Sequence, residues 1–244
     1  MSSTTWTPPA VASEARPWAQ AAWRIVEAQH VASTMKLVDD AAEQDLLEAL
    51  LEEGKPPLPP EAAGLDYLLA TPFRYDPPRP GSRFRAATDP GVFYAAQHVR
   101  TACAELAYWR WRFLIDAVDL ERLEPVAHTA FRVRIATKAV DLRRPPFDRD
   151  AAAWTDPLDY RATQAFAAVA RQAGIGAIVY RSVRDPRPAW CVALLTPTGF
   201  AAPRPEPRRQ TWWIAVQRDA VVCRREDEVL EFAAGDWASG GLAE

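Results

Sequence analysis

The spacing of apolar positions predicts two helices in the N-terminal part of the chain. Residues 1 to about 15 are rich in Ser, Thr, Pro and Ala, which indicates a loose segment. From Pro17 a helix is predicted, because apolar residues recur at helical spacing and proline suits a first helical turn. The positions at this spacing are Trp18, Ala22, Ile25 or Val26, and Gln29. A second helix is predicted from its cap at Asp39 and Asp40 to Gly54, which ends it. Its apolar stripe is Leu46, Leu47, Leu50 and Leu51.

A change of pattern after these helices marks the start of a core domain. The proline-rich run from Lys55 to Pro60 is typical of a stiff linker, so we expect residues 1–64 to form a helical N-terminal extension. The core begins at Leu65. A buried strand is predicted at Val92–Tyr94, followed by the longest helix of the domain over Ala95–Ile115. The inner face expected for this helix is Val99, Cys103 or Leu106, Trp109 or Arg110, and Phe113.

Strand patterns dominate the rest of the chain, with one further helix between them. That helix is predicted from a cap at Asp159 and Tyr160 to Ala173, and Gly174 ends it. The predicted strands are His128–Ile135, continued by Lys138–Leu142, then Ile175–Tyr180 and Ala189–Leu195, with Trp212–Val216 and Val221–Cys223 as edge strands. The order predicts an α/β (α+β) fold with a mixed central sheet and flanking helices. We expect the catalytic domain over residues 65–200 and a C-terminal tail over 201–244 that completes it.

Composition narrows the classes of function. The net charge is -3, which gives no overall attraction to nucleic acid or to an anionic membrane. No stretch approaches the length of a membrane span, and the start of the chain lacks the pattern of a signal peptide. Three widely spaced cysteines and three scattered histidines favour neither a disulfide framework nor a metal centre. These features predict a cytoplasmic protein that binds no metal.

The residues that carry candidate chemistry are arginine, tyrosine and glutamate around one predicted strand and helix. Arg83, Tyr94 and Glu105 are spaced by eleven residues each, a spacing that a strand-turn-helix unit can fold onto one cleft. Arginines bind pyrophosphate through bidentate, charge-assisted hydrogen bonds, and a tyrosine ring packs against a heteroaromatic base. A partly buried glutamate stabilises the positive charge that develops when a glycosidic bond to a cationic leaving group breaks. No G-x-G-x-x-G motif or P-loop lysine is present, so the pattern favours a dinucleotide such as NAD as a substrate rather than a hydride carrier.

Four motifs in order resemble the RES-domain family, which is named for its Arg, Glu and Ser. The motifs are Gly81–Arg85, Pro90–Tyr94, Thr101–Glu105 and Tyr180–Asp185, and the resemblance covers roughly Leu65 to Phe200. The family comprises toxins of bacterial toxin–antitoxin modules that are paired with an Xre-like antitoxin. Its characterised members are similar in fold to ADP-ribosyltransferase toxins. They destroy NAD as phosphorylases or glycohydrolases, or transfer ADP-ribose to a protein.

The resemblance implies a set of site residues. The signature Arg, Tyr, Glu and Ser of the family fall on Arg83, Tyr94, Glu105 and Ser182. An additional Arg-Tyr pair of the family matches Arg74 and Tyr75, and we expect both residues, together with Phe84, to line the same NAD pocket. The chain departs from the family at Ser82–Arg85, where the common tetrad is Gly-Arg-Trp-Asn.

The resemblance also implies a reaction and a partner. NAD is expected as the substrate, inorganic phosphate as a candidate co-substrate, and an Xre-like antitoxin as the protein partner. One alternative is a nucleotide-binding protein that does not turn its ligand over. Another is a non-catalytic subunit of a larger assembly, with self-association through the apolar stripe of the second helix.

Several of these residues have a plainer interpretation that the sequence leaves open. Glu105 would pair with Arg100 or Arg112 on the surface of a helix, and such a pair contributes only a few tenths of a kcal/mol. Ser182 would cap the turn before Asp185 and Pro186. Without an activating His-Asp pair Ser182 is not a nucleophile, and we interpret it as a residue that orients the substrate. The tryptophans at 109, 111, 212 and 213 are interpreted as core or interface residues.

Overall fold

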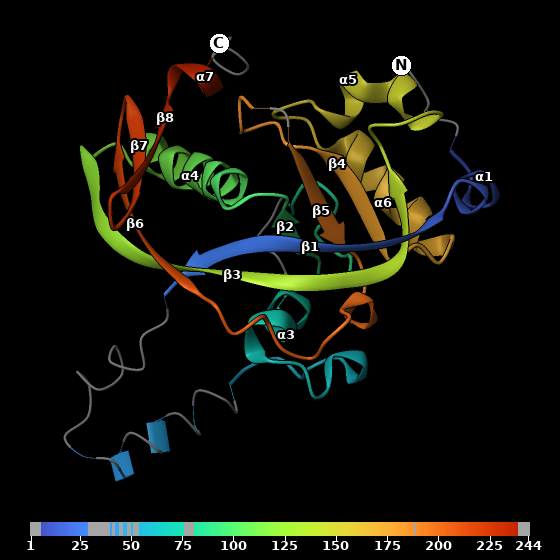
Figure 1. Ribbon diagram of the computed structural model, residues 1–244, viewed down its shortest axis with the longest axis horizontal. Coiled ribbons are helices and arrows are strands. Elements are labelled where there is room, and N and C mark those ends of the chain that lie inside the picture. The colour runs from blue at the N-terminus through green and yellow to red at the C-terminus, as the bar shows by residue number, and fades with distance from the viewer. Residues whose placement is uncertain are drawn as a thin grey trace.

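The chain folds as a mixed α+β protein around one twisted sheet, as a computed structural model shows (Figure 1). The structure describes residues 6–28, 40, 42–43, 46–47, 50, 54–75, 81–187 and 189–238. Eight strands of these residues form the sheet, in the order β1-β2-β5-β4-β3-β6-β7-β8. Their bounds are β1 Arg16–Glu27, β2 Phe93–Ala96, β3 Arg122–Asp141, β4 Ala177–Arg181, β5 Trp190–Leu194, β6 Gln210–Gln217, β7 Ala220–Arg225 and β8 Glu228–Ala233. Only β3 and β4 pair in parallel among these strands, so the predicted mixed sheet is confirmed.

Strand β1 closes part of the sheet into a ring. It pairs with β3 along its whole length, from Arg16 opposite Ala139 to Glu27 opposite His128, and it also meets β2 at Trp23. The pairings β1–β2–β5–β4–β3 therefore return to β1. Figure 1 shows β1 and the long, curved β3 running side by side across the molecule.

The helix predicted from Pro17 is wrong, because Arg16–Glu27 is this strand. Positions three apart lie on one face of a helix but on opposite faces of a strand. Ala22 and Ile25 are both buried, in two different clusters on either side of the sheet. A strand with apolar residues on both faces therefore imitated the spacing of an amphipathic helix.

The segment before β1 is also more ordered than its composition predicts. Helix α1 (Pro8–Ser13) begins at a cap, where the hydroxyl of Thr7 accepts a hydrogen bond from the Ala10 N–H at 3.4 Å. Trp6 and Val11 are buried, and the indole of Trp6 donates to Asp150 at 2.8 Å. These apolar contacts hold a segment that was predicted to be loose.

The second predicted helix lies largely outside the described residues. At its expected start, the carboxylate of Asp40 accepts a hydrogen bond from the Glu43 N–H at 2.9 Å, as a capping residue does. The described residues 42–43, 46–47 and 50 are helical, and the Gly54 N–H donates to the Leu50 carbonyl at 3.2 Å. Leu46 and Leu50 of the apolar stripe are exposed, and the other positions of the prediction, including Asp39 and Leu51, lie outside the described residues. The division of the chain at residues 64 and 200 stays a prediction.

Helices cover both faces of the sheet. Their bounds are α3 Tyr67–Arg74, α4 Val99–Asp116, α5 Ala151–Trp154, α6 Arg161–Gln172 and α7 Gly235–Ala238, with short 3-10 turns at Pro60–Ala62, Phe147–Asp150 and Pro197–Gly199. Helices α4 and α6 pack on one core cluster, and α3 packs on the other. In Figure 1, α4 and α6 lie above β1 and β3, and α3 lies below them.

Helix α4 is the longest described helix, as predicted, but it starts at Val99 rather than at Ala95 and buries a different set of side chains. The structure places Ala95 and Ala96 in β2. The residues of α4 that are buried are Thr101, Ala102, Cys103, Ala104, Ala107, Tyr108, Trp111 and Leu114. Trp109 and Phe113, assigned to the inner face by spacing, are 53% and 60% exposed. The alanines of α4 pack in the core together with Tyr108, Trp111 and Leu114, whereas Trp109 and Phe113 border a cleft.

The C-terminal segment adds three strands rather than an edge pair. Strands β6 and β7 lie inside the sheet, between β3 and β8, so their prediction as edge strands is wrong. The edge of the described sheet is β8, which the sequence analysis missed because Glu228 and Glu231 interrupt its apolar pattern. Trp237, just beyond β8, is buried against Tyr108 and Trp111 of α4.

Candidate active site

A cleft of about 1200 Å³ runs along α4. Its walls come from β1, β2, the end of α3, the loop at residues 81–85, the segment 157–160, and the ends of β4 and β5. This volume exceeds the roughly 300–1,000 Å³ that is typical of ligand pockets. Arg83, Tyr94 and Glu105 all line the cleft, so the fold brings together the three residues that are spaced by eleven.

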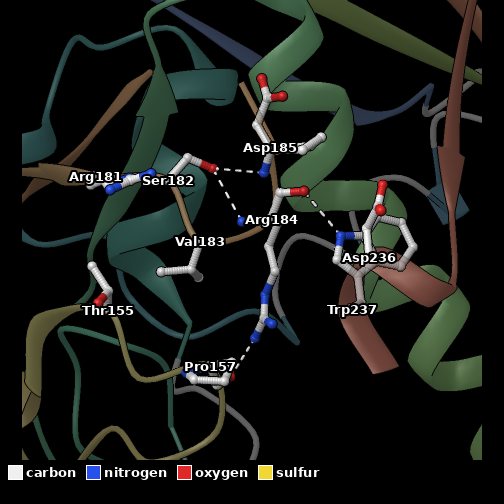
Figure 2. A pocket seen from close by; sticks show the side chains of 10 residues that line it. Thr155, Pro157, Arg181, Ser182, Val183, Arg184, Asp185, Asp236 and Trp237 are labelled. Carbon is white, nitrogen blue, oxygen red and sulfur yellow. Dashed lines mark hydrogen bonds between the residues drawn. The ribbon is translucent and has the colours of Figure 1, made fainter. Parts of the chain in front are cut away.

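Glu105 is fixed by a serine from a distant strand end. The Ser182 hydroxyl donates to Glu105 Oε1 at 2.6 Å, across 77 residues of sequence. Ser182 Oγ also accepts the N–H groups of Arg184 at 3.3 Å and Asp185 at 3.1 Å (Figure 2). The serine therefore caps a turn, as its plainer interpretation has it, and orients the glutamate as well. Its single proton is committed to the carboxylate.

Asp185 attaches the turn that carries Ser182 to the start of α4. Its carboxylate accepts a hydrogen bond from Thr101 Oγ1 at 2.8 Å and forms an ion pair with Arg100. Asp185 is 7% exposed, and Thr101 is fully buried. A buried carboxylate that keeps both partners is stable in place, whereas one that loses a partner is strongly destabilising. Because Arg100 and Thr101 lie on the same helix as Glu105, their contacts with Asp185 hold Ser182 next to Glu105.

Arg83 is buried at the cleft wall with one nitrogen unpaired. Its Nη1 donates to the carbonyl oxygens of Trp154 at 3.1 Å and Asp156 at 2.9 Å. Its guanidinium lies over the Tyr160 ring, 4.6 Å from the centroid. Its Nη2 is buried and has no hydrogen-bond partner among the described residues. A buried guanidinium with an unused donor has a strong requirement for an acceptor.

Tyr94 holds the loop that presents Arg83. Its hydroxyl shares a hydrogen bond with Ser82 Oγ at 2.8 Å and accepts the Phe84 N–H at 3.0 Å. Burial raises the pKa of the Tyr94 hydroxyl above its ordinary value, and the hydrogen bond with Ser82 opposes that effect. Tyr94 is therefore a neutral phenol at pH 7, fixed on the loop by its oxygen, with its ring beside the cleft.

The loop itself is a tight turn that requires a glycine. Ser82 and Arg85 exchange backbone hydrogen bonds of 2.8 and 3.1 Å. Gly81, which precedes the turn, has a φ of +97°, and a Cβ there would lie 2.3 Å from the Arg85 carbonyl oxygen. This explains why a glycine starts the motif.

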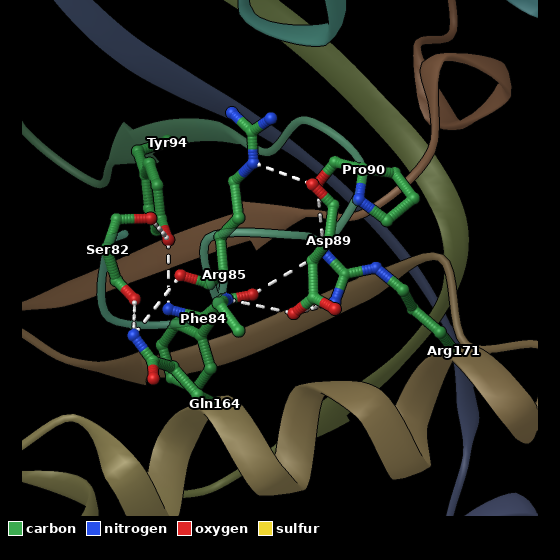
Figure 3. A network of polar contacts seen from close by, with 9 residues as sticks. Ser82, Phe84, Arg85, Asp89, Pro90, Tyr94, Gln164 and Arg171 are labelled. Carbon is green, nitrogen blue, oxygen red and sulfur yellow. Dashed lines mark hydrogen bonds and ion pairs between the residues drawn. The ribbon is translucent and has the colours of Figure 1, made fainter. Parts of the chain in front are cut away.

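Helix α6 supports the loop from below. Gln164 Nε2 donates to the carbonyls of Ser82 at 3.0 Å and Arg85 at 3.2 Å (Figure 3). Arg171 Nη2 donates to the Pro90 carbonyl at 3.3 Å, and its Nη1 lies 3.6 Å from Asp89 Oδ2. The loop is thus fixed from α6 as well as by Tyr94.

The remaining predicted pocket residues lie in different places. Tyr75 lines the cleft and is 39% exposed, whereas the ring of Phe84 is buried and packs on Tyr180 at 4.8 Å. Arg74 is not among the residues that line the described cleft. Its Nε donates to the Pro56 carbonyl at 2.6 Å, away from Glu105. Arg85 donates to the carbonyls of Asp89 and Tyr75, so it braces the loop where the family has asparagine.

Arg184 and Tyr160 are cleft residues that the sequence analysis missed. The Arg184 guanidinium lies 3.3 Å from the centroid of the Tyr108 ring, and its Nη2 donates to the Tyr160 hydroxyl at 3.3 Å. Arg184 also donates to the Pro157 carbonyl, as Figure 2 shows. The signal was present, because Arg184 stands two residues after Ser182 in the same motif. The sequence could not show that the Arg184 side chain lines the cleft, because that depends on the fold.

Arg24 is a further missed residue, because it lies on the strand that was predicted as a helix. Its Nη1 donates to the Tyr94 carbonyl at 2.8 Å, and its guanidinium lies 4.7 Å from the Phe93 ring centroid. Burial lowers the pKa of Arg24 to about 10. It lines the cleft and joins β1 to β2 there.

A smaller cavity of about 330 Å³ adjoins the cleft behind Ser182. Arg184 and Pro157 line both spaces, and Arg181, Asp236 and Trp237 line the smaller one (Figure 2). Since Glu105 faces the cleft and Ser182 the smaller cavity, their hydrogen bond lies at the boundary between the two spaces.

Two buried acids beside Glu105 stay protonated. Burial raises the pKa of the Cys191 thiol well above its ordinary value, and the Glu105 carboxylate adds to that effect. Burial likewise raises the pKa of Tyr180, with Cys191 and Glu105 adding to it. Cys191 Sγ lies 3.7 Å from Glu105 Oε1 as a donor, so the thiol is a hydrogen-bonding neighbour rather than a thiolate nucleophile.

Two features are absent from the described residues, a metal-binding cluster and a membrane-spanning helix. No group of three or more His, Cys, Asp or Glu side chains among them is arranged to hold a metal ion. No helix in the same part of the chain has the length and apolar character needed to cross a membrane.

Comparison with known proteins gives a family match and a likeness to solved structures. The family described as RES domain matches residues 58–216, which is more than half of the chain. No curated protein matches the sequence. Among solved structures, the crystal structure of the M. tuberculosis MbcT–MbcA toxin–antitoxin complex is similar, with 10% sequence identity and a TM-score of 0.44. That match covers 93% of this chain and 91% of the other.

Proposed function

The chain belongs to the RES domain family, and from this membership and the geometry of the cleft we propose that it is an enzyme that consumes NAD. The bond broken is the one between nicotinamide and ribose. The observation that carries the proposal is the hydrogen bond of 2.6 Å from Ser182 to Glu105 in a cleft that Arg83 also lines. A fixed carboxylate beside unused guanidinium donors suits a substrate with a cationic leaving group and a pyrophosphate.

The reaction separates nicotinamide from the anomeric carbon of ribose. The bonding electrons leave with the pyridinium nitrogen, so nicotinamide departs neutral and the ribose becomes an oxocarbenium-like cation. The carboxylate of Glu105 stabilises this charge, and its Oε2 accepts a hydrogen bond from a ribose hydroxyl, because Ser182 and Cys191 both contact Oε1. Ser182 and the Cys191 thiol keep the other oxygen oriented.

The arginines act on the pyrophosphate. Arg83 presents its buried, unpaired Nη2, and Arg184 lines the same cleft 3.3 Å above the Tyr108 ring. Guanidinium groups bind phosphate oxygens through charge-assisted hydrogen bonds. The ring of Tyr94 packs on the nicotinamide side of the substrate.

An acceptor completes the reaction by forming a bond to the anomeric carbon. Attack by water gives ADP-ribose and releases a proton. Attack by inorganic phosphate gives ADP-ribose phosphorylated at the anomeric position, and a protein side chain would become ADP-ribosylated. All three routes share the departure of nicotinamide, and we propose the phosphorolytic or hydrolytic one, as the family resemblance implies.

We also propose that the chain is the toxin of a toxin–antitoxin pair with an Xre-like antitoxin. Membership of the RES domain family supports this pairing. The three cysteines are free, which agrees with our placement of the enzyme in the cytoplasm.

The test is the release of nicotinamide from NAD by the purified chain. We expect release, measured by chromatography with and without phosphate, and the dependence on phosphate identifies the acceptor. NAD that binds in a 1:1 ratio without product would show a nucleotide-binding protein instead. Absence of release under both conditions, with a folded protein, would reject the proposed activity.

A further inference from the structure

One end of the cleft carries an exposed aromatic surface that the proposed chemistry does not use. Trp109 and Phe113 of α4 both line the cleft, one helical turn apart, and are 53% and 60% exposed. We refer to these two side chains as the aromatic ledge. Large aromatic side chains that remain exposed inside a concave site mark a binding surface more often than a packing defect.

The ledge continues the reaction site along the same helix. The cleft follows α4 from Ala102 to Asp116, which corresponds to about 21 Å at 1.5 Å per residue. Glu105, Trp109 and Phe113 are spaced by four residues, so they lie close to one face of the helix. A ligand that places its ribose at Glu105 and extends along the cleft therefore reaches the ledge.

Arg184 contacts α4 at Tyr108, between Glu105 and the ledge, and shares the Tyr160 side chain with Arg83. Arg83 lies over Tyr160, and Arg184 contacts both Tyr160 and the ring of Tyr108. Tyr108 in turn packs edge-on against Trp109, with ring centroids 5.2 Å apart. The order of groups is thus carboxylate, guanidinium, then indole. A dinucleotide has the matching order of reacting ribose, pyrophosphate and second nucleoside.

The charge at the ledge also favours a neutral base rather than a phosphate. The arginine next to the ledge, Arg112, is paired with Asp116 at 3.0 Å. The edge-on contact with Tyr108 leaves the faces of the indole available for stacking. Every nucleobase has a π-face, and stacking on an aromatic side chain requires no other recognition.

We propose that the aromatic ledge of Trp109 and Phe113 binds the nucleobase of the substrate that is distant from the reacting ribose. This inference rests on the proposed function, because it assumes a dinucleotide in the cleft. The ledge makes the enzyme prefer NAD over nicotinamide mononucleotide, which has the same reacting bond but lacks the adenosine half.

The experiment compares nicotinamide release from these two substrates. Trp109→Ala is expected to lower the ratio of kcat/KM for NAD to kcat/KM for the mononucleotide about tenfold, within the range of base stacking on one aromatic residue. The loss is expected in KM for NAD more than in kcat. Phe113→Ala is expected to act in the same direction, and Trp109→Phe to restore most of the preference. Trp213→Ala is the matched control, since Trp213 is 52% exposed on β6 and is not a lining residue of the described cleft.

The possible results test the aromatic ledge separately from the proposed function. An equal loss with both substrates would assign Trp109 to folding or to the reacting end, and it would overturn the ledge. An unchanged KM for NAD in Trp109→Ala would overturn it too, and would leave the aromatic surface to a protein partner. If the wild-type chain releases nicotinamide from neither substrate, the proposed function fails. The ledge is then judged by calorimetric titration with ADP, where about tenfold weaker binding to Trp109→Ala supports it and equal affinity rejects it.

Discussion

Ser182 illustrates how much of this site depends on one hydroxyl group. It closes a turn by accepting two backbone N–H groups and gives its only proton to Glu105. A hydroxyl with this set of partners orients a carboxylate, and no His-Asp pair lies among its contacts to activate it for attack. We therefore assign the proposed chemistry of the site to Glu105 and to the arginines of the cleft.

Loss of the charged groups tests this assignment. We expect Glu105→Gln and Arg83→Ala each to lower the turnover of NAD at least about a hundredfold, the scale of one lost transition-state interaction. Nicotinamide release measures the rate, and the thermal midpoint verifies that each variant is folded. Glu124→Gln is the control, since its carboxylate is 69% exposed in a surface ion pair. Wild-type rates for both site variants would refute the assigned roles.

Buried acids near the site predict how stability depends on pH. The folded protein raises the pKa of Tyr94, Tyr180 and Cys191, mainly by burial. The unfolded chain releases these protons first, so their contribution to the free energy of unfolding is fully present below about pH 8 and is lost as the pH rises further. Urea denaturation between pH 7 and 10.5 is expected to show this decline.

A conservative change separates this effect from general alkaline damage. Tyr180→Phe is expected to flatten the decline above about pH 9.5, because it removes one of the raised groups. Tyr67→Phe is expected to keep the wild-type slope, because Tyr67 is 56% exposed in the folded state. Identical slopes for the wild type and Tyr180→Phe would contradict the assignment.

At the residue scale, the sequence identified candidate site residues but did not show which of them contact one another. Arg83, Tyr94 and Glu105 could be named because their motifs and spacing are local features. The bond from Ser182 to Glu105 spans 77 residues, and only the fold creates it. Gln164 had no signal at all, since a glutamine on a helix is ordinary until a loop lies against it.

Among the local elements, the turn at residues 81–85 determines where Arg83 points. Gly81→Ala is expected to lower turnover at least about tenfold, because its Cβ would lie 2.3 Å from the Arg85 carbonyl and the turn would have to open. Gly64→Ala is the matched control. Gly64 has a φ of +80° with no atom within 4 Å of an added Cβ, so it carries the backbone strain without the clash. Nicotinamide release and thermal midpoints distinguish the two, and equal losses of activity would argue against this role of the turn.

Elements were predictable where the apolar pattern was continuous or confined to one face, and were misassigned where neighbouring apolar residues serve two different surroundings. Strands β4 and β5 are apolar throughout and were found, as was α6 with its terminal Gly174. Strand β1 was taken for a helix because Ala22 and Ile25 serve different cores. The inner face of α4 was misassigned because Trp109 and Phe113 border the cleft instead of the core.

For the whole molecule, the family match and the folding unit have different extents. The match covers residues 58–216, but β1, β7 and β8 lie outside it and belong to the same sheet. Trp237, also outside, packs on Tyr108 of the cleft wall. The sequence could not show this, because paired residues of β1 and β3 are more than 100 positions apart in the chain.

A fragment of residues 58–216 is therefore expected to lack a stable fold. It exposes the β3 edge that β1 covers over twelve residue pairs and the β6 edge that β7 covers. Circular dichroism is expected to show less secondary structure than in the full chain, and amide hydrogen exchange is expected to show little protection. A fragment that is protected and releases nicotinamide would refute this extent of the folding unit.

The pairing of β1 with β3 also sets a timetable for biosynthesis. About 100 residues separate Glu27 from its partner His128, so at roughly 5–20 residues per second β1 waits about 5–20 s for its partner strand. Ser182, which orients Glu105, follows later still. We expect ribosome-bound chains that end before residue 182 to release no nicotinamide, which translation-arrested chains of increasing length can measure. Under the proposed function, the order of synthesis delays NAD consumption until most of the chain has been made, which leaves time for the proposed antitoxin to be present first.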